Sequence, residues 1–204
     1  MENKDQTENV VPTMPPTPKK QSTMSSIWEF VRFIIVALII VIPIRVFVAQ
    51  PFIVSGSSMV PTFENGQYLI VDELSYRFHA PARGDVIVFH PPIDPTKYYI
   101  KRVIGLPGDT VTIKQGKVTI TNKDHPAGFE LNEPYVVNID RNTVPITSVV
   151  KDGQYFAMGD NRPASFDSRS WGTVPQNLIT GTAFLRLIPL QKIGIHPGDY
   201  KQAE

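Results

Sequence analysis

The chain has one long apolar stretch near its beginning. An unbroken apolar run covers 33–44, which is short of the roughly 20 residues that a membrane-spanning helix needs. Extension to 27–49 reaches that length and adds charged residues only near the two ends, where they can reach lipid headgroups. A buried core helix is the alternative, but the stretch has almost no polar face to present to water. We therefore predict an uncleaved transmembrane anchor over 27–49.

The charges around this stretch predict its orientation. Lys19, Lys20 and Arg32 precede the apolar run, whereas only Arg45 follows it closely. The positive-inside rule then places the polar, proline-containing tail 1–26, which we expect to be disordered, in the cytoplasm. The rest of the chain would lie on the extracytoplasmic side of the cell membrane after a single pass. A cleavable signal peptide is disfavoured, because its charged region would be unusually long and a proline follows the candidate cleavage position.

Beyond the anchor, short apolar or alternating runs recur between turn signals, as in a β-rich domain. These runs cover 67–72, 85–89, 98–104, 110–114, 117–121, 154–158 and 182–188. The clearest signal is a hairpin in which Gln115-Gly116 separates two alternating strands. The more polar stretch 122–149 is expected to leave the core as a small β excursion. We predict a mostly β, antiparallel, partly closed barrel-like domain over 50–204.

Composition excludes several classes of protein. A formal net charge of +1 provides no basic field for a nucleic-acid partner. The absence of cysteine rules out disulfides, thiol catalysis and thiolate metal sites. A length of 204 residues supports one compact domain with an appendage, which agrees with an anchored β domain. The oligomeric state is left open.

Three polar motifs follow the anchor in order. They are SGSSMVPT at 55–62, YIKRVIGLPGD at 99–109 and GDNRPASFDSRSWG at 159–172. Taken alone, the first is an ordinary turn of serine, glycine and proline. Together, the three resemble the bacterial type I signal peptidases, in particular the short Gram-positive members, over about 50–188. The resemblance implies a membrane-bound Ser/Lys peptidase that cuts signal (leader) peptides from exported preproteins and needs no cofactor.

The resemblance implies that Ser58 is the nucleophile. Ser57 is its chemical competitor, but the residues that follow, from Met59 onward, fix the register. The backbone N–H of Ser58 would help to form the oxyanion hole. Some relatives have a second hydroxyl donor where this chain has Gly56, so the second donor is left open.

The same resemblance implies that Lys101 is the general base. Strand alternation puts Lys101 on one face with Tyr99 and Val103, and Arg102 on the other face. A lysine is a poor base unless desolvation lowers its pKa, and a fall from about 10.4 to roughly 8 corresponds to about 3 kcal/mol. A lone lysine in a strand more often serves solubility. None of the four histidines lies in a motif with an orienting carboxylate, so no histidine base is expected.

The third motif alternates carboxylates with arginines. By resemblance, Ser165 orients the lysine, and Asp160, Asp167 and Arg169 hold the loop around the site. Because arginines lie between the aspartates, a cation is disfavoured and no metal is expected. The residues expected to line the substrate cleft come from segments that flank the dyad: Phe52, Val54, Met59, Tyr99 and Ile100.

Such apolar walls accept small side chains, and the resemblance implies a preference for alanine-like residues one and three positions before the scissile bond. An extended peptide added to a sheet edge would present both residues to one side. The apolar segment 46–54 would keep the cleft at the bilayer surface. Two alternatives stay open: a catalytically silent, membrane-tethered module that binds leaders, and a Ser/Lys self-cleaving or plasmid-transfer peptidase. The presence of both Ser58 and Lys101 argues against the first, and the third motif against the second.

Overall fold

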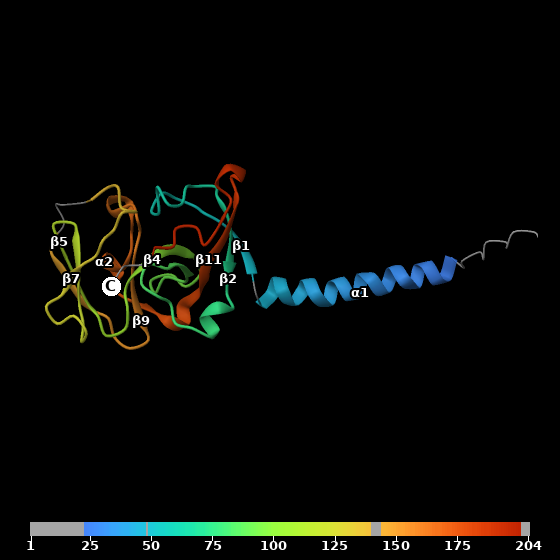
Figure 1. Ribbon diagram of the computed structural model, residues 1–204, viewed down its shortest axis with the longest axis horizontal. Coiled ribbons are helices and arrows are strands. Elements are labelled where there is room, and N and C mark those ends of the chain that lie inside the picture. Colours follow the sequence, from blue (N-terminus) through green and yellow to red (C-terminus); the bar gives the residue numbers. More distant parts are fainter. Residues whose placement is uncertain (1–22, 48, 140–143, 201–204) are drawn as a thin grey trace, which may run out of the picture. The chain divides into compact units, whose positions relative to one another are not determined.

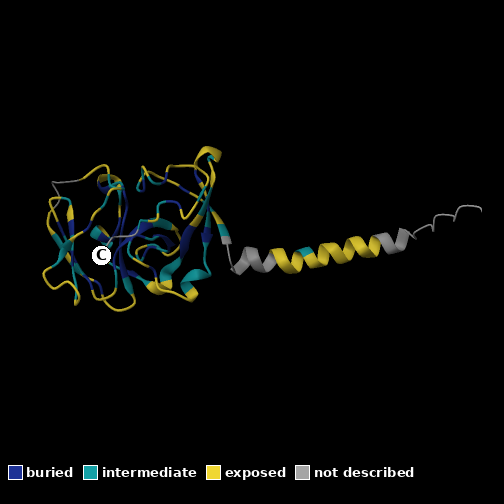
Figure 2. Ribbon diagram, viewed as in Figure 1, coloured by how far each residue is buried: buried dark blue, intermediate teal, exposed yellow. Residues whose placement is uncertain are grey.

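A computed structural model describes residues 23–47, 49–139 and 144–200 (Figure 1). The chain divides into two compact units between Val41 and Ile42. Helix α1 (Thr23–Phe47) covers most of the segment predicted as an anchor. Its described side chains, at 27–41, are mainly apolar and exposed (Figure 2). Within the described part of the chain, no helix is both long and apolar enough to cross a membrane.

The larger sheet of the second unit is antiparallel throughout and curls into a half-barrel (Figure 1). Its strand order is β1-β2-β11-β3-β4-β9-β10, and β12 pairs with β11. The strands are β1 (Ala49–Ile53), β2 (Tyr68–Asp72), β3 (Val86–Phe89), β4 (Tyr99–Gly105), β9 (Gln154–Met158), β10 (Val174–Pro175), β11 (Ile179–Ile188) and β12 (Gly194–Ile195). The prediction of a mostly β, antiparallel fold is therefore confirmed.

A second sheet is built on the predicted hairpin. Its order is β7-β6-β5-β8, formed by β5 (Thr110–Lys114), β6 (Lys117–Thr121), β7 (Phe129–Glu130) and β8 (Ile146–Val149). Gln115 and Gly116 both have positive φ, of 51° and 78°, as a type I′ turn requires. The small sheet therefore begins at the hairpin, upstream of the stretch 122–149 that was expected to form the excursion.

The core lies along the strands that the alternation predicted. All four residues of β3 are buried, as expected for a strand covered on both faces. One cluster packs the hairpin against β9, and another packs β2 and β3 against the segment that follows β1. Short helices complete the fold: η1 (Ser75–Arg77), η2 (Arg162–Ala164), α2 (Ser168–Trp171), η3 (Gln176–Leu178) and η4 (Leu190–Lys192).

Candidate active site

Ser58 and Lys101 lie at hydrogen-bonding distance. Lys101 is in the middle of β4, paired with Ile87 of β3, and Ser58 lies in the irregular segment between β1 and β2. The Lys101 Nζ atom is 2.6 Å from Ser58 Oγ. The lysine is only 4% exposed, because its strand is inside the sheet and the Ser58 segment lies against its amine. A neutral amine at this distance can accept the proton of a hydroxyl group.

The environment of Lys101 favours the neutral amine. Burial lowers its pKa from 10.5 to about 8. The carboxylates of Asp167 and Asp160 raise the pKa and so oppose this effect, whereas the guanidinium of Arg169 lowers it further. Desolvation dominates because no carboxylate forms a direct ion pair with the amine among the described residues. An appreciable fraction of the lysine is therefore uncharged near neutral pH.

The third motif holds the Ser58 segment through Asn161. The backbone N–H of Asn161 donates to Ser58 O at 3.0 Å, and its side-chain amide donates to Ser57 O at 3.0 Å. Gly159 allows this close approach, since a Cβ atom there would overlap with Ser58 O and with the Ser165 hydroxyl. The backbone N–H of Gly56 is engaged elsewhere, by the Asn65 side chain at 3.0 Å. Asn161 is not among the site residues expected from the sequence, because nothing in the local sequence indicates which groups its amide contacts.

Ser165 lies in the same loop, and its Oγ atom is buried. Within the described residues, this oxygen has no hydrogen-bond partner. The structure thus places the Ser165 hydroxyl beside Gly159, in the loop that contacts the Ser58 segment, without a hydrogen bond to Lys101. Its role in orienting the lysine stays a prediction.

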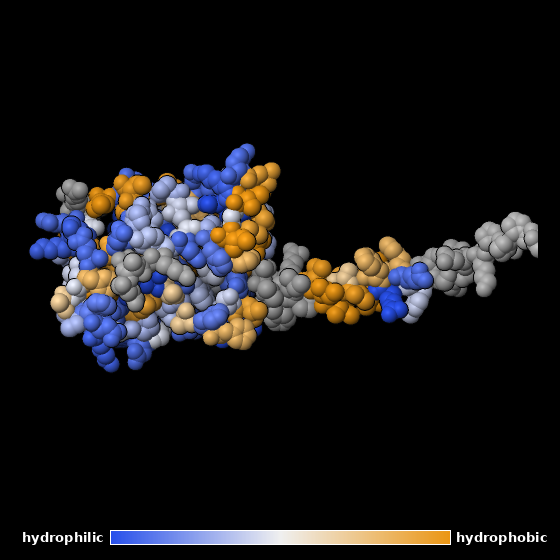
Figure 3. Space-filling model, viewed as in Figure 1, coloured by the Kyte–Doolittle hydropathy of each residue, from blue (hydrophilic) through white to orange (hydrophobic). Residues whose placement is uncertain are grey.

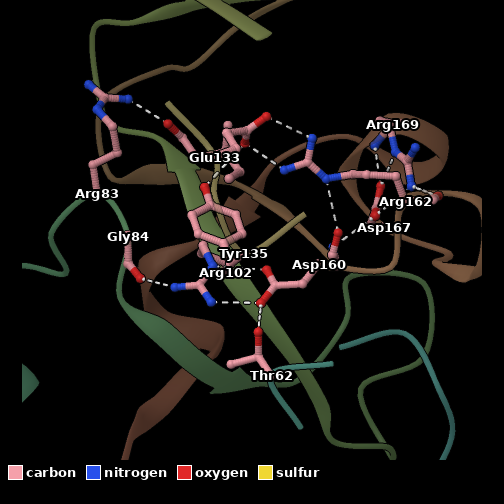
Figure 4. A network of polar contacts seen from close by, with 12 residues as sticks. Thr62, Arg83, Gly84, Arg102, Glu133, Tyr135, Asp160, Arg162, Asp167 and Arg169 are labelled. Atoms are coloured by element: carbon pink, nitrogen blue, oxygen red, sulfur yellow. Dashed lines mark hydrogen bonds and ion pairs between the residues drawn. The ribbon is translucent and has the colours of Figure 1, made fainter. Parts of the chain in front are cut away.

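The two predicted supporting carboxylates, Asp160 and Asp167, are paired with different arginines. Asp160 accepts two hydrogen bonds from Arg102, from Nε at 2.9 Å and from Nη2 at 2.6 Å, and both side chains are completely buried (Figure 4). Asp167 accepts from Arg169 Nε at 2.8 Å. Asp160 also accepts from the hydroxyl of Thr62 at 2.5 Å, so this pair reaches the end of the Ser58 segment.

A further pair connects the loop to the segment that follows β7. Arg162 donates to both carboxylate oxygens of Glu133, at 3.0 and 2.5 Å, and its Nε atom donates to Gly159 O at 3.1 Å (Figure 4). The ring of Tyr135 lies over the guanidinium of Arg102, with 3.9 Å from its carbon to the ring centroid. Glu133 and Tyr135 fall in the polar stretch whose role the sequence left undetermined.

A cleft of about 610 Å³ contains the dyad. Of the predicted substrate-binding residues, Phe52, Val54, Tyr99 and Ile100 line it. Met59 instead packs into the core and is 1% exposed. The cleft is also lined by residues that the sequence analysis did not name, including Tyr98, Ala164 and Phe166.

The comparison with known proteins decides the family. Residues 27–188 match the family described as signal peptidase, peptidase S26. The chain belongs to this family. It is a bacterial type I signal peptidase by descent and a serine endopeptidase by class, as the three motifs predicted.

Relatives of this signal peptidase match along most of their length. A probable signal peptidase I-1 from Synechocystis sp. is 40% identical, over 86% of this chain and 91% of the relative. A signal peptidase I from Bacillus licheniformis is 32% identical, over 86% of this chain and 96% of the relative. A crystal structure of a signal peptidase I from Enterococcus faecalis V583 is 33% identical, over 51% of this chain and 97% of that chain, with a TM-score of 0.43.

Proposed function

We propose that this peptidase removes N-terminal signal peptides from exported preproteins, with Ser58 as nucleophile and Lys101 as general base. One observation carries the proposal: a buried lysine amine lies 2.6 Å from the hydroxyl of Ser58. The lowered pKa of Lys101 supports the role, because a base must be uncharged to accept a proton. The names of the relatives agree with signal peptides as the substrate class.

The reaction follows from this pair. The neutral amine of Lys101 accepts the Ser58 proton as Oγ attacks the scissile carbonyl carbon, which gives a tetrahedral oxyanion. The resulting ammonium then donates its proton to the leaving amine, and an acyl-enzyme remains on Ser58. Water, deprotonated by the same amine, releases the signal peptide and restores the serine. The backbone N–H of Ser58 is the proposed oxyanion donor, a contribution of about 3 kcal/mol.

The cleft lining supports a substrate with small apolar side chains. Phe52 and Tyr98 are in ring contact, with centroids 4.9 Å apart, and both line the cleft with Val54 and Ile100. We propose that an extended peptide runs along this wall and presents its side chains one and three positions before the scissile bond to the same side. A larger side chain would be excluded by steric overlap rather than by lost affinity alone.

Membrane association is also part of the proposal. The described side chains of α1 are mainly apolar and exposed, and contact between such a surface and water is unfavourable. Apolar side chains predominate along the described part of α1 (Figure 3). The larger sheet has a second apolar surface, in which Ile53, Tyr68 and Ile188 lie side by side on neighbouring strands. Both apolar surfaces favour the interpretation that this peptidase binds a lipid bilayer. A single pass with a cytoplasmic N-terminus stays a prediction.

Cleavage of a synthetic leader peptide tests the dyad. We expect Ser58→Ala and Lys101→Ala to abolish cleavage with an unchanged far-ultraviolet circular dichroism spectrum, and Ser57→Ala to retain substantial activity. A dead Ser57→Ala with an active Ser58→Ala would reverse the assignment. A wild-type protein that binds the leader without cutting it would support the silent binding module instead.

Sedimentation with liposomes tests the bilayer. The double variant Ile35→Lys/Ile39→Lys introduces charge into the exposed apolar face of α1, and we expect it to leave the liposome fraction. Its matched control is Val137→Lys/Val149→Lys, which changes two exposed apolar positions near the small sheet and should remain bound. Equal binding of the two double variants would contradict attachment through α1.

A further inference from the structure

The segment that follows β12 lies outside the part of the chain that matches the family, which ends at residue 188. We call residues 197–200 the strap. Pro197 is buried, and the chain turns sharply on both sides of it, with positive φ at His196 (47°) and Gly198 (84°). The mechanism proposed above makes no use of this segment.

The strap supplies one of the hydrogen-bond acceptors of the Arg102 guanidinium. One Nη1 hydrogen of this arginine is donated to Gly84 O at 2.8 Å, and Nη1 also donates to Gly198 O of the strap. With Asp160 on the other side, the guanidinium is completely buried. Displacement of the strap would therefore leave a buried donor of this ion pair without its acceptor and expose the pair to water.

The strap also packs against the end of the nucleophile segment. A Cβ atom added at Gly198 would lie 2.5 Å from the methyl carbon of Thr62 and 3.1 Å from the ring of Phe63. Thr62 is fixed in turn, since its hydroxyl donates to Asp160 at 2.5 Å and its carbonyl accepts from Arg186 at 2.8 Å. Thr62 is thus held from three directions, and one of them is the strap.

At its other end, the strap contacts the segment that follows β7. The hydroxyl of Tyr200 accepts a hydrogen bond from the amide of Asn132 at 2.8 Å, and its ring contacts that of Tyr135 at 5.5 Å between centroids. Tyr135 is the ring that covers Arg102. The backbone of Tyr200 lies so close to Gly84 that a side chain there would overlap with it. The strap thus contacts the segment that contains Ser58, Arg102 of β4 and the segment that follows β7.

We propose that the strap is a positioning element of the active site, in which Gly198 and Tyr200 keep the Ser58 segment in register with Lys101. Gly198 contacts both Thr62 and Arg102. Thr62 lies at the end of the segment that contains Ser58, and Arg102 directly follows Lys101 in the chain. The inference rests on the proposed dyad, because register matters only if Ser58 must deliver its proton to Lys101. A displacement of about 1 Å between reacting groups can lower a rate about a hundredfold.

The test adds one methyl group. Gly198→Ala should lower kcat for a synthetic leader peptide about tenfold or more, with KM within about twofold, because the cleft wall is untouched. Its matched control is Gly108→Ala, also at a positive φ (89°) but with nothing within 4 Å of the new Cβ, and this variant should keep its kcat. Thermal unfolding of each variant shows that the assay temperature leaves the protein folded. Equal kcat values for the two variants would overturn the inference.

A second substitution separates position from backbone strain. Thr62→Ser removes the methyl that the new Cβ of Gly198→Ala meets and keeps the hydroxyl that binds Asp160. We expect the double variant to recover most of the kcat lost in Gly198→Ala, a coupling that strain at residue 198 alone would not produce. Absence of recovery would contradict the inference.

A third pair of variants decides the matter if Gly198→Ala and the double variant do not fold. Tyr200→Ala removes the ring against Tyr135 and should lower kcat about threefold or more, whereas Tyr200→Phe keeps the ring and should restore it. Equal kcat for these two would refute the role of the strap. Ser58→Ala is assayed in parallel: if it still cuts, the proposed dyad has failed, and if it is dead while Gly198→Ala matches its control, only the strap inference has failed.

Discussion

Replacement of Lys101 by methionine should stabilise the protein while abolishing its activity. Burial lowers the pKa of this lysine from 10.5 to about 8. Below pH 8 the folded chain therefore contains a buried ammonium group, which is more stable in the unfolded chain, where water solvates it. The difference corresponds to about 3 kcal/mol of unfolding free energy. Lys101→Met keeps an unbranched side chain at this site and removes the charge.

The effect has a defined pH dependence. Between pH 8 and 10.5 the unfolded chain binds the lysine proton and the folded chain has lost it, so the unfolding free energy of the wild type rises with pH in this window. Between pH 7 and 9.5 the rise should reach about 2 kcal/mol. Burial raises the pKa of Tyr76 and Tyr135, which destabilises the fold only at more alkaline pH. The unfolding free energy of Lys101→Met should not show this rise between pH 7 and 9.5.

The assay is urea unfolding of both proteins in mild detergent, followed by tryptophan fluorescence at several pH values across this range. Lys114→Met, at an exposed strand position, is the control and should follow the wild type. The wild-type kcat/KM should increase through the same pKa of about 8, because the neutral amine is the base. A constant stability difference between wild type and Lys101→Met from pH 7 to 9.5, or a flat activity profile, would refute the reasoning.

Three further predictions concern the groups around the dyad. Arg169→Gln removes a cation that lowers the pKa of Lys101, so the kcat/KM profile should move to higher pH; an unchanged profile would contradict this. Asp160→Ala leaves Arg102 buried and unpaired and should lower the unfolding free energy in urea by about 3–5 kcal/mol; a loss below about 1 kcal/mol would show that the pair is solvated. Ser165→Ala removes a hydroxyl without a partner among the described residues, so the unfolding temperature should hold, while kcat falls about tenfold if it orients the lysine.

Local pattern was enough to place most strands. The run 98–104 was predicted from its apolar and aromatic residues, and β4 covers Tyr99–Gly105. The hairpin strands have the predicted bounds, with Ile113 opposite Val118 across the turn. These elements were predictable because strand periodicity and turn chemistry both act over a few residues.

The pairing of distant segments could not be predicted in the same way. β11 lies between β2 and β3 in the sheet, although it is far from both in sequence. Which distant strands pair depends on the fit between their apolar faces after long loops have closed, and no local pattern records that fit. The partner of Asp160 is Arg102, 58 positions earlier, and the partner of Arg162 is Glu133, in a stretch with little pattern. An isolated arginine or glutamate carries no local signal of the group that it will meet.

The two cations at the centre of β4 show how one strand can separate a base from a structural ion pair. Lys101 and Arg102 are adjacent and both buried, but alternation turns them to opposite faces. Arg102 forms an ion pair with Asp160 through two hydrogen bonds, and Arg169 forms one with Asp167. The two carboxylates that raise the pKa of Lys101 are therefore each paired with another cation. With the carboxylates so engaged, desolvation decides the pKa of the lysine. Arg102 and Arg169 therefore influence the chemistry without touching the reacting atoms, because each of them pairs with one of the two carboxylates that would otherwise keep the amine of Lys101 charged.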